Sequence, residues 1–158
     1  MNSLTKLCDR IECLVRLIGV ALFATMIAVV FFEVVMRYVF NSPTFWSEAL
    51  ARFAMVWLVM LGLARGIRHL DNIRVDFLVE QMPPRIQLAA AWARYGAVLV
   101  FAAVMLIYGT KLAIGNANNI NTGFAISAMW TYLSVPVSGA LILLFVVELI
   151  AKGERGLF

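Results

Sequence analysis

The chain has 158 residues, of which 63% are hydrophobic and 14% charged, with a mean hydropathy of +0.92 and a formal net charge of +4. Soluble domains have a charged fraction of about a quarter, so this composition excludes an ordinary soluble domain and indicates an integral membrane protein. Lipid satisfies no backbone hydrogen-bonding group, and the membrane spans are therefore expected to be helices. The predicted fold class is an all-α integral membrane protein.

Charge-free runs bounded by turn residues and interfacial aromatic residues predict four transmembrane helices in a single membrane domain of residues 1–158. The predicted spans are residues 18–39, 46–66, 86–114 and 128–151. Ahead of the first span, apolar residues at helical spacing suggest a short interfacial helix on the membrane surface. An inward extension of the first span is the alternative. Basic residues gather at the two chain ends and between the second and third spans, so the positive-inside rule predicts that both termini are cytoplasmic.

The first two spans contain four charged residues, Glu33, Arg37, Glu48 and Arg52. Their positions are mirror-related about the turn between the spans, so each acid is expected to face a base of the other helix at the same depth. Glu33 is expected near the midplane of an apolar core about 30 Å thick, where an unpaired charge costs about 2.5 to 3.5 kcal/mol. The pattern predicts an interhelical ladder of ion pairs, or else contact of these charges with a partner subunit.

The turn that joins the first two spans is predicted to contain Asn41 and Pro43, two residue types that favour turns. Trp46 follows at the expected membrane interface, where an amphipathic aromatic ring is stable, so it is interpreted as an anchor. An ordinary connecting loop is the alternative interpretation. A second loop, at residues 115–127, is rich in asparagine and separates the third and fourth spans.

Small residues four positions apart predict close contacts between membrane helices. Gly62 and Gly66 form such a pair in the second span, and Ser134 and Ser138 form one in the fourth. Pro136 is the only proline well inside a predicted span, and it predicts a helix kink. The sequence shows neither the internal repeat nor the paired broken helices that build the substrate site of many transporters. The small-residue pairs and Pro136 are therefore interpreted as features of helix packing and not of a substrate site.

The chain has few of the side chains that metal or cofactor chemistry needs. His69 is the only histidine and there are two cysteines, so a haem held by two histidines and a four-ligand zinc site are excluded within one chain. The sequence has no phosphate-cradling glycine loop, and its candidate nucleophiles have no histidine partner at a suitable depth. An enzyme is therefore not expected, nor is a cofactor in this chain. An accessory or scaffold subunit is predicted.

Several segments resemble, in order and spacing, the small membrane subunit of tripartite ATP-independent periplasmic (TRAP) transporters. They are RYVFNSPTFWSE at residues 37–48, IRVDFL at residues 73–78, WTY at residues 130–132 and VPVSG at residues 135–139. The resemblance extends over residues 18–151, which is nearly the whole chain. It places His69, Arg74 and Asp76 in the cytoplasmic segment between the second and third spans. There, His69 is expected to pair with Asp71 or to be solvated, with a role in a proton relay as a further alternative.

The resemblance implies a four-helix protein of a bacterial inner membrane that associates with a large permease subunit. In that family a periplasmic solute-binding protein delivers an organic acid, often a carboxylate, and the large subunit moves it inward with sodium ions. The small subunit would enlarge the fixed scaffold, so the ligands of substrate and sodium are expected outside this chain. The four intramembrane charges would order the helical hairpin or meet the large subunit, and the loop at residues 115–127 would contact the binding protein.

Two other functions remain open from the residues alone. An autonomous proton-coupled exporter, working as a homodimer, would use Glu33 as its proton and substrate carboxylate. The expected pairing of Glu33 with Arg52 argues against this function, because a permanently paired acid is a poor proton exchanger. A structural subunit of another membrane complex is the second alternative.

Overall fold

The computed structural model describes residues 3–42, 44–69, 84–119 and 127–153. Its helices are α1 (Ser3–Tyr38), α2 (Phe45–Arg68), α4 (Pro84–Gly115), α5 (Met129–Tyr132) and α6 (Ser134–Gly153). Four segments are long and apolar enough to cross a membrane: Thr5–Tyr38, Trp46–Arg68, Trp92–Gly115 and Met129–Ala151, the last formed by α5 and α6. The predicted helical architecture with four candidate spans is confirmed.

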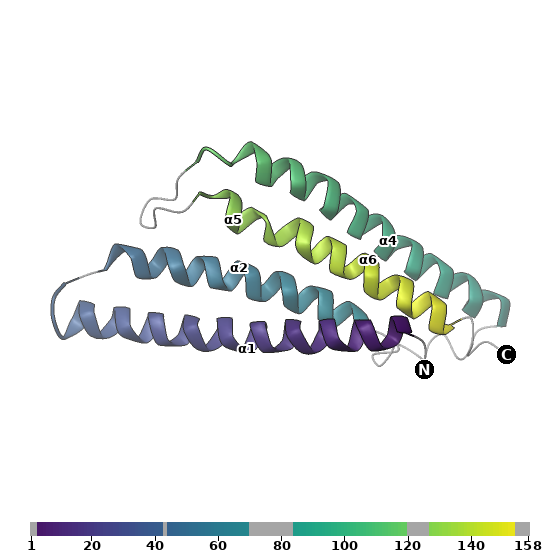
Figure 1. Ribbon diagram of the computed structural model, residues 1–158, viewed down its shortest axis with the longest axis horizontal. Helices are drawn as coiled ribbons and strands as arrows, with labels where there is room; N and C mark the ends of the chain where they lie inside the picture. Colours follow the sequence, from purple (N-terminus) through teal and green to yellow (C-terminus); the bar gives the residue numbers. More distant parts are fainter. Residues whose placement is uncertain (1–2, 43, 70–83, 120–126, 154–158) are drawn as a thin grey trace.

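The long helices lie side by side in the order α1, α2, α6 and α4 (Figure 1). α1 packs on α2, α2 packs on α6, and α6 packs on α4, so α2 and α6 form the middle of the layer. α1 begins and α6 ends at the same end of the bundle, at the right of Figure 1. The location of that end on the cytoplasmic side of the membrane stays a prediction.

α1 is one continuous helix of 36 residues, so the separate interfacial helix predicted near the N-terminus is wrong and an extended first span is correct. At about 1.5 Å per residue α1 is about 54 Å long, well beyond an apolar core of about 30 Å. One face of its first turns is covered by protein, since Cys8 and Val15 are only 2% and 7% exposed. Cys8 packs in one core with Ala64 of α2 and Phe145 of α6. These contacts hold the N-terminal turns in line with the span.

The core of the bundle lies along α6. Half of the apolar window formed by α5 and α6 is buried, whereas only 6% of the α1 window is buried. Ile142 and Phe145 have no exposed surface, and neither do Ser134 and Ser138. The two serine hydroxyls donate to backbone carbonyls three residues earlier, at 2.7 and 2.9 Å. The small serine pair of the fourth span is thus buried with its polar atoms satisfied.

Close helix contact depends on two glycines of α4 and α6. A Cβ added at Gly139 would lie 3.0 Å from the backbone nitrogen of Leu106, and one at Gly109 would lie 2.8 Å from a side-chain carbon of α6. The predicted pair in the second span behaves differently, because a Cβ added at Gly62 or Gly66 would meet nothing within 4 Å. Close packing at Gly62 and Gly66 therefore does not occur within the described chain, and both glycines are exposed.

The outer surface of the bundle is apolar. Exposed fractions reach 66% for Leu17 and 69% for Phe31 on α1, and 65% for Val100 on α4. Large exposed apolar surfaces mark contact with lipid or with a partner protein. These surfaces lie on the two outer helices, α1 and α4, where they can contact either lipid or a partner protein.

Candidate functional site

The four charged residues of the predicted ladder pair within their own helices. On α1, Nη2 of Arg37 lies 3.5 Å from Oε1 of Glu33. On α2, Nη2 of Arg52 donates to Oε1 of Glu48 at 2.6 Å. Residues four apart on a helix share one face, so each acid has a base within reach in its own helix. The structure corrects the interhelical ladder, because the ion pairs recorded for these side chains in the described residues do not cross the turn.

These two ion pairs are poorly covered by the chain itself. The side chains of Arg37, Glu48 and Arg52 are 57%, 69% and 72% exposed, and that of Glu33 is 19% exposed. Residues 17–32 of α1 carry no charge and extend for about 24 Å at 1.5 Å per residue. Glu33 therefore lies at one boundary of this uncharged stretch. Its depth near the midplane of the membrane stays a prediction.

The turn after α1 contains Asn41, as predicted. Its φ of +50° lies in the left-handed region, which asparagine adopts more readily than most residues. The N–H of Ser42 donates to a carbonyl in the last turn of α1 at 3.1 Å. The ring centroid of Trp46 lies 6.0 Å from that of Phe32, so an aromatic contact joins α2 to α1 near the turn. Pro43 lies outside the described residues.

A second group of charges lies at the opposite end of the α1–α2 hairpin. It is centred on Arg68, the last residue of α2, whose side chain is only 6% exposed. We call this group the Arg68 cluster, and its members are Asp9 and Glu12 of α1, Arg65 and Arg68 of α2, His69 directly after α2, and Glu148 of α6.

The Arg68 guanidinium bonds acids from two other helices. Nη2 donates to Asp9 at 2.6 Å and to one Glu148 oxygen at 3.0 Å, while Nε donates to the other Glu148 oxygen at 2.9 Å. Nη1 donates to Glu12 and to the carbonyl oxygen of Cys8, the latter at 3.2 Å. The paired bonds to Glu148 match the planar fork that a guanidinium presents to a carboxylate. Arg68 therefore links α2 to α1 and to α6.

This link is buried and so is energetically demanding. Glu148 is only 3% exposed on its side chain, and the guanidinium carbon of Arg68 lies 5.2 Å from the centre of the Phe145 ring. The free-energy cost of taking two charges out of water is offset only when both charges form well-aligned hydrogen bonds. Removing one partner of such a buried pair costs about 3 to 5 kcal/mol. The cluster therefore positions three helices relative to one another at this end of the bundle.

His69 and Arg65 join the same cluster through Glu12. Nε2 of His69 lies 2.7 Å from Oε1 of Glu12, and Nε of Arg65 donates to the same oxygen at 3.4 Å. His69 thus contacts α1, while its side chain stays 46% exposed. Its predicted pairing with Asp71 stays a prediction. Three residues named for this part of the chain lie outside the described residues: Asp71, Arg74 and Asp76.

The sequence interpretation did not single out Glu12 or Glu148, although a signal was present. Glu148 is the only charged residue between Lys111 and Lys152, so it lies alone in an apolar helix. An acid inside a membrane helix usually faces the bundle and pairs with a base. The bases at the end of the second span lie at the same end of the bundle, which makes Arg68 the natural partner.

Comparison with known proteins gives a consistent result. The family described as tripartite ATP-independent periplasmic transporters, DctQ component, matches residues 26–156. The sialic acid TRAP transporter small permease protein SiaQ of Vibrio cholerae is 29% identical over 139 residues, which are 88% of this chain and 79% of that protein. The C4-dicarboxylate TRAP transporter small permease protein DctQ of the same organism is 28% identical over 130 residues, 82% of this chain and 52% of that protein.

A longer relative contains a similar segment. The sialic acid TRAP transporter permease protein SiaT of Haemophilus influenzae is 28% identical over 128 residues, which are 80% of this chain but only 20% of that protein. The chain therefore spans about half of one relative and a fifth of another. Since the family match covers most of its length, this chain belongs to the DctQ family and is a multi-pass small permease subunit of a bacterial TRAP transporter, not an enzyme.

Proposed function

We propose that this chain is a scaffold subunit that pairs with a large permease subunit in a bacterial inner membrane. The complex would take up an organic acid of the carboxylate class in symport with sodium ions, after delivery by a periplasmic solute-binding protein. The large subunit would bind the substrate and the sodium ions, and this chain would hold no cofactor. The main support for pairing with a large subunit is that 80% of this chain matches 20% of the longer SiaT permease.

That match supports the pairing through a simple structural argument. A permease with a segment similar to this chain joins both parts in one polypeptide, whereas a separate chain has to find its larger partner by noncovalent contact. The substrate class is supported by the two small permease relatives, whose names refer to sialic acid and to C4-dicarboxylates. Both substrates carry carboxylate groups.

The exposed ion pairs suggest that a partner protein contacts the α1–α2 hairpin at the end that contains the Asn41 turn. Glu48 and Arg52 are 69% and 72% exposed in the chain alone, and they lie next to an apolar surface. Ionised side chains near lipid are usually paired with one another or covered by protein. We assign Glu48, Arg52 and the neighbouring Arg37 to contact with the large subunit, with Glu33 ordering Arg37 from within α1.

The geometry does not favour an autonomous exporter. Such an exporter requires an acid that gains and loses a proton during its cycle, and Glu33 was the candidate. Glu33 lies 3.5 Å from Arg37 and at the boundary of the apolar stretch. Its carboxylate is already engaged in an ion pair within α1, which opposes a proton-carrying role.

Co-purification tests the pairing directly. The tagged chain is extracted from its native membrane in a mild detergent, and the proteins that remain bound are identified and quantified by mass spectrometry. We expect one large multi-span permease at near-equal amount. The recovered pair, reconstituted with its binding protein, is expected to take up a carboxylate only with an inward sodium gradient, with a neutral sugar as the control. Recovery of this chain alone as a stable dimer would refute the proposal.

A further inference from the structure

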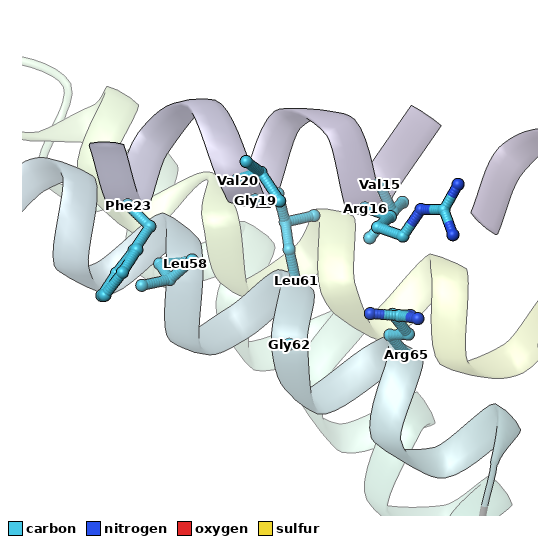
Figure 2. Close-up of a pocket in the computed structure, with 9 residues that line it drawn as sticks. All are labelled: Val15, Arg16, Gly19, Val20, Phe23, Leu58, Leu61, Gly62 and Arg65. Atoms are coloured by element: carbon cyan, nitrogen blue, oxygen red, sulfur yellow. The ribbon is translucent and has the colours of Figure 1, made fainter. Parts of the chain in front are cut away.

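A groove of about 240 Å³ lies on the outer surface between α1 and α2 (Figure 2). The α1 side is formed by Gly19 and Phe23 among other residues, and the α2 side by Leu58, Leu61 and Gly62. Apart from its charged end, the lining is apolar. Gly19 and Gly62 have no side chain, and this absence leaves the space open between the two helices.

Two arginines lie at one end of this groove. Figure 2 shows Arg16 of α1 and Arg65 of α2 at the same end, with the apolar residues extending away from them. Nε of Arg65 donates to Glu12 at 3.4 Å, which is the one hydrogen bond recorded for this guanidinium in the described residues. Within the part of the chain that the structure describes, Arg16 makes one long contact, of 4.0 Å to the sulfur of Cys13. Most N–H groups of the two side chains therefore have no hydrogen-bond partner among the described residues.

The arginines mark the level at which apolar surface ends. Arg16 directly precedes the uncharged residues 17–32 of α1, and Arg65 directly follows the uncharged residues 53–64 of α2. Basic side chains at such positions lie near lipid headgroups, and basic pockets between membrane helices bind anionic headgroups. From Arg16 to Phe23 the groove extends about 10 Å at 1.5 Å per residue, about a third of an apolar core about 30 Å thick.

We propose that this groove binds one anionic phospholipid of the surrounding bilayer. The phosphate would lie between Arg16 and Arg65 and accept hydrogen bonds from both guanidinium groups. An acyl chain would extend along the apolar lining toward Phe23. The complementarity selects this occupant: the cations match a phosphate, the apolar lining matches a hydrocarbon chain, and the two meet where headgroup and chain meet in a membrane. The proposal does not rest on the proposed transport function.

Two pairs of variants separate this site from general attraction to lipid. Arg16→Gln removes one cation from the groove, and Arg94→Gln removes an exposed arginine on α4 as its control. Gly62→Leu places a side chain at a residue that lines the groove, where an added Cβ meets nothing within 4 Å among the described residues. Gly96→Leu on α4 is the matched control, since a Cβ at Gly96 also has open space. Arg16→Lys keeps the charge while it changes the shape of the donor.

The measurement is native mass spectrometry of the purified full chain, titrated with phosphatidylglycerol or with phosphatidylcholine. We expect one phosphatidylglycerol to be retained in preference to phosphatidylcholine. Arg16→Gln should weaken its binding about fivefold, the effect of one arginine near an anionic headgroup, and Arg16→Lys should retain most of the binding. Gly62→Leu should abolish the tightly bound lipid, while Arg94→Gln and Gly96→Leu should leave it unchanged.

Four outcomes would overturn the proposal. Equal retention of the two lipids would remove the anionic selectivity, and equal weakening by Arg16→Gln and Arg94→Gln would show unspecific attraction. Inorganic phosphate that displaces the lipid at equal concentration would identify a soluble anion as the occupant. Loss of a co-purified permease from Gly62→Leu, with lipid retention unchanged, would identify a protein partner as the occupant. Far-ultraviolet circular dichroism of each variant confirms that the helices are intact.

Discussion

Replacement of Arg68 by methionine tests the role of the Arg68 cluster. Methionine keeps an unbranched stem but removes the guanidinium, and with it the ion pairs to Asp9, Glu12 and Glu148. Because the Arg68 side chain is only 6% exposed, loss of one partner from the buried network should cost about 3 to 5 kcal/mol. For a chain of this length each kcal/mol shifts the midpoint of thermal unfolding by about 2 to 4 °C. The expected decrease is about 6 to 20 °C.

The assay is thermal unfolding of the purified chain in one detergent, followed by loss of the monodisperse peak in size-exclusion chromatography. Arg52→Met is the matched control, since Arg52 is on the same helix and is also ion-paired but is 72% exposed. An exposed pair contributes about 0 to 1 kcal/mol, so this control should shift the midpoint by less than about 4 °C. Arg68→Lys should be intermediate, because an ammonium keeps the charge but cannot form the forked pair with Glu148.

If Arg68→Met unfolded at the same temperature as Arg52→Met, the buried ion pairs of Arg68 would contribute no more to stability than an exposed pair. A double variant gives a second check. If Arg68 and Glu148 act as one unit, Arg68→Met with Glu148→Leu should be less destabilised than the sum of the two single changes. Strict additivity would show that the bonds between Arg68 and Glu148 contribute nothing to stability.

The remaining predictions concern the outer end of the hairpin, the α4–α6 contact and the topology. Glu48→Gln should reduce the amount of large permease that co-purifies, while the chain's own free energy of unfolding changes by less than about 1 kcal/mol. The exchange Glu48→Arg with Arg52→Glu should recover part of the lost permease. Equal yields of permease from wild type and Glu48→Gln would contradict the assigned contact. Gly139→Leu should destabilise the chain by about 1 to 3 kcal/mol or more, because its Cβ would lie 3.0 Å from the α4 backbone, and Gly96→Leu should not. Asn41→Val should reduce stability by about 1 to 2 kcal/mol because of its positive φ, with Asn41→Gly near neutral, both read from thermal unfolding. Alkaline phosphatase fused to the C-terminus should be inactive in cells, because the C-terminus is predicted to be cytoplasmic. An active fusion would show that the C-terminus lies on the opposite side of the membrane.

Much of the architecture could be predicted because membrane insertion is a local property. A helix of about 20 apolar residues satisfies its own backbone and needs no distant contact, so the positions of the four spans follow from hydropathy alone. The turn at Asn41 is local for the same reason, since it depends on which residues tolerate a positive φ. Family membership could likewise be predicted from motifs spread along the chain, and the family match confirms it.

The partners of the charges could not be predicted in the same way. Mirror symmetry about the turn placed acids opposite bases, yet Glu33 and Glu48 pair with the bases four residues along their own helices. The rotation of each helix about its axis decides which side chains face inward, and that rotation is set by packing of the whole bundle. Gly62 shows the same effect, because the residue predicted to pack closely against another helix instead lines the open groove between α1 and α2.

Hydropathy and motif order are read along the chain, so they are sufficient to predict four helices that could span a membrane and membership of a transporter family. The ion pairs of Arg68 with acids of α1 and α6, and the cationic groove between α1 and α2, arise only in the folded bundle. The acids of the cluster are separated from Arg68 by 56 to 80 positions in the chain. Such contacts depend on how the helices are rotated and aligned against one another, and local sequence patterns do not encode these quantities directly.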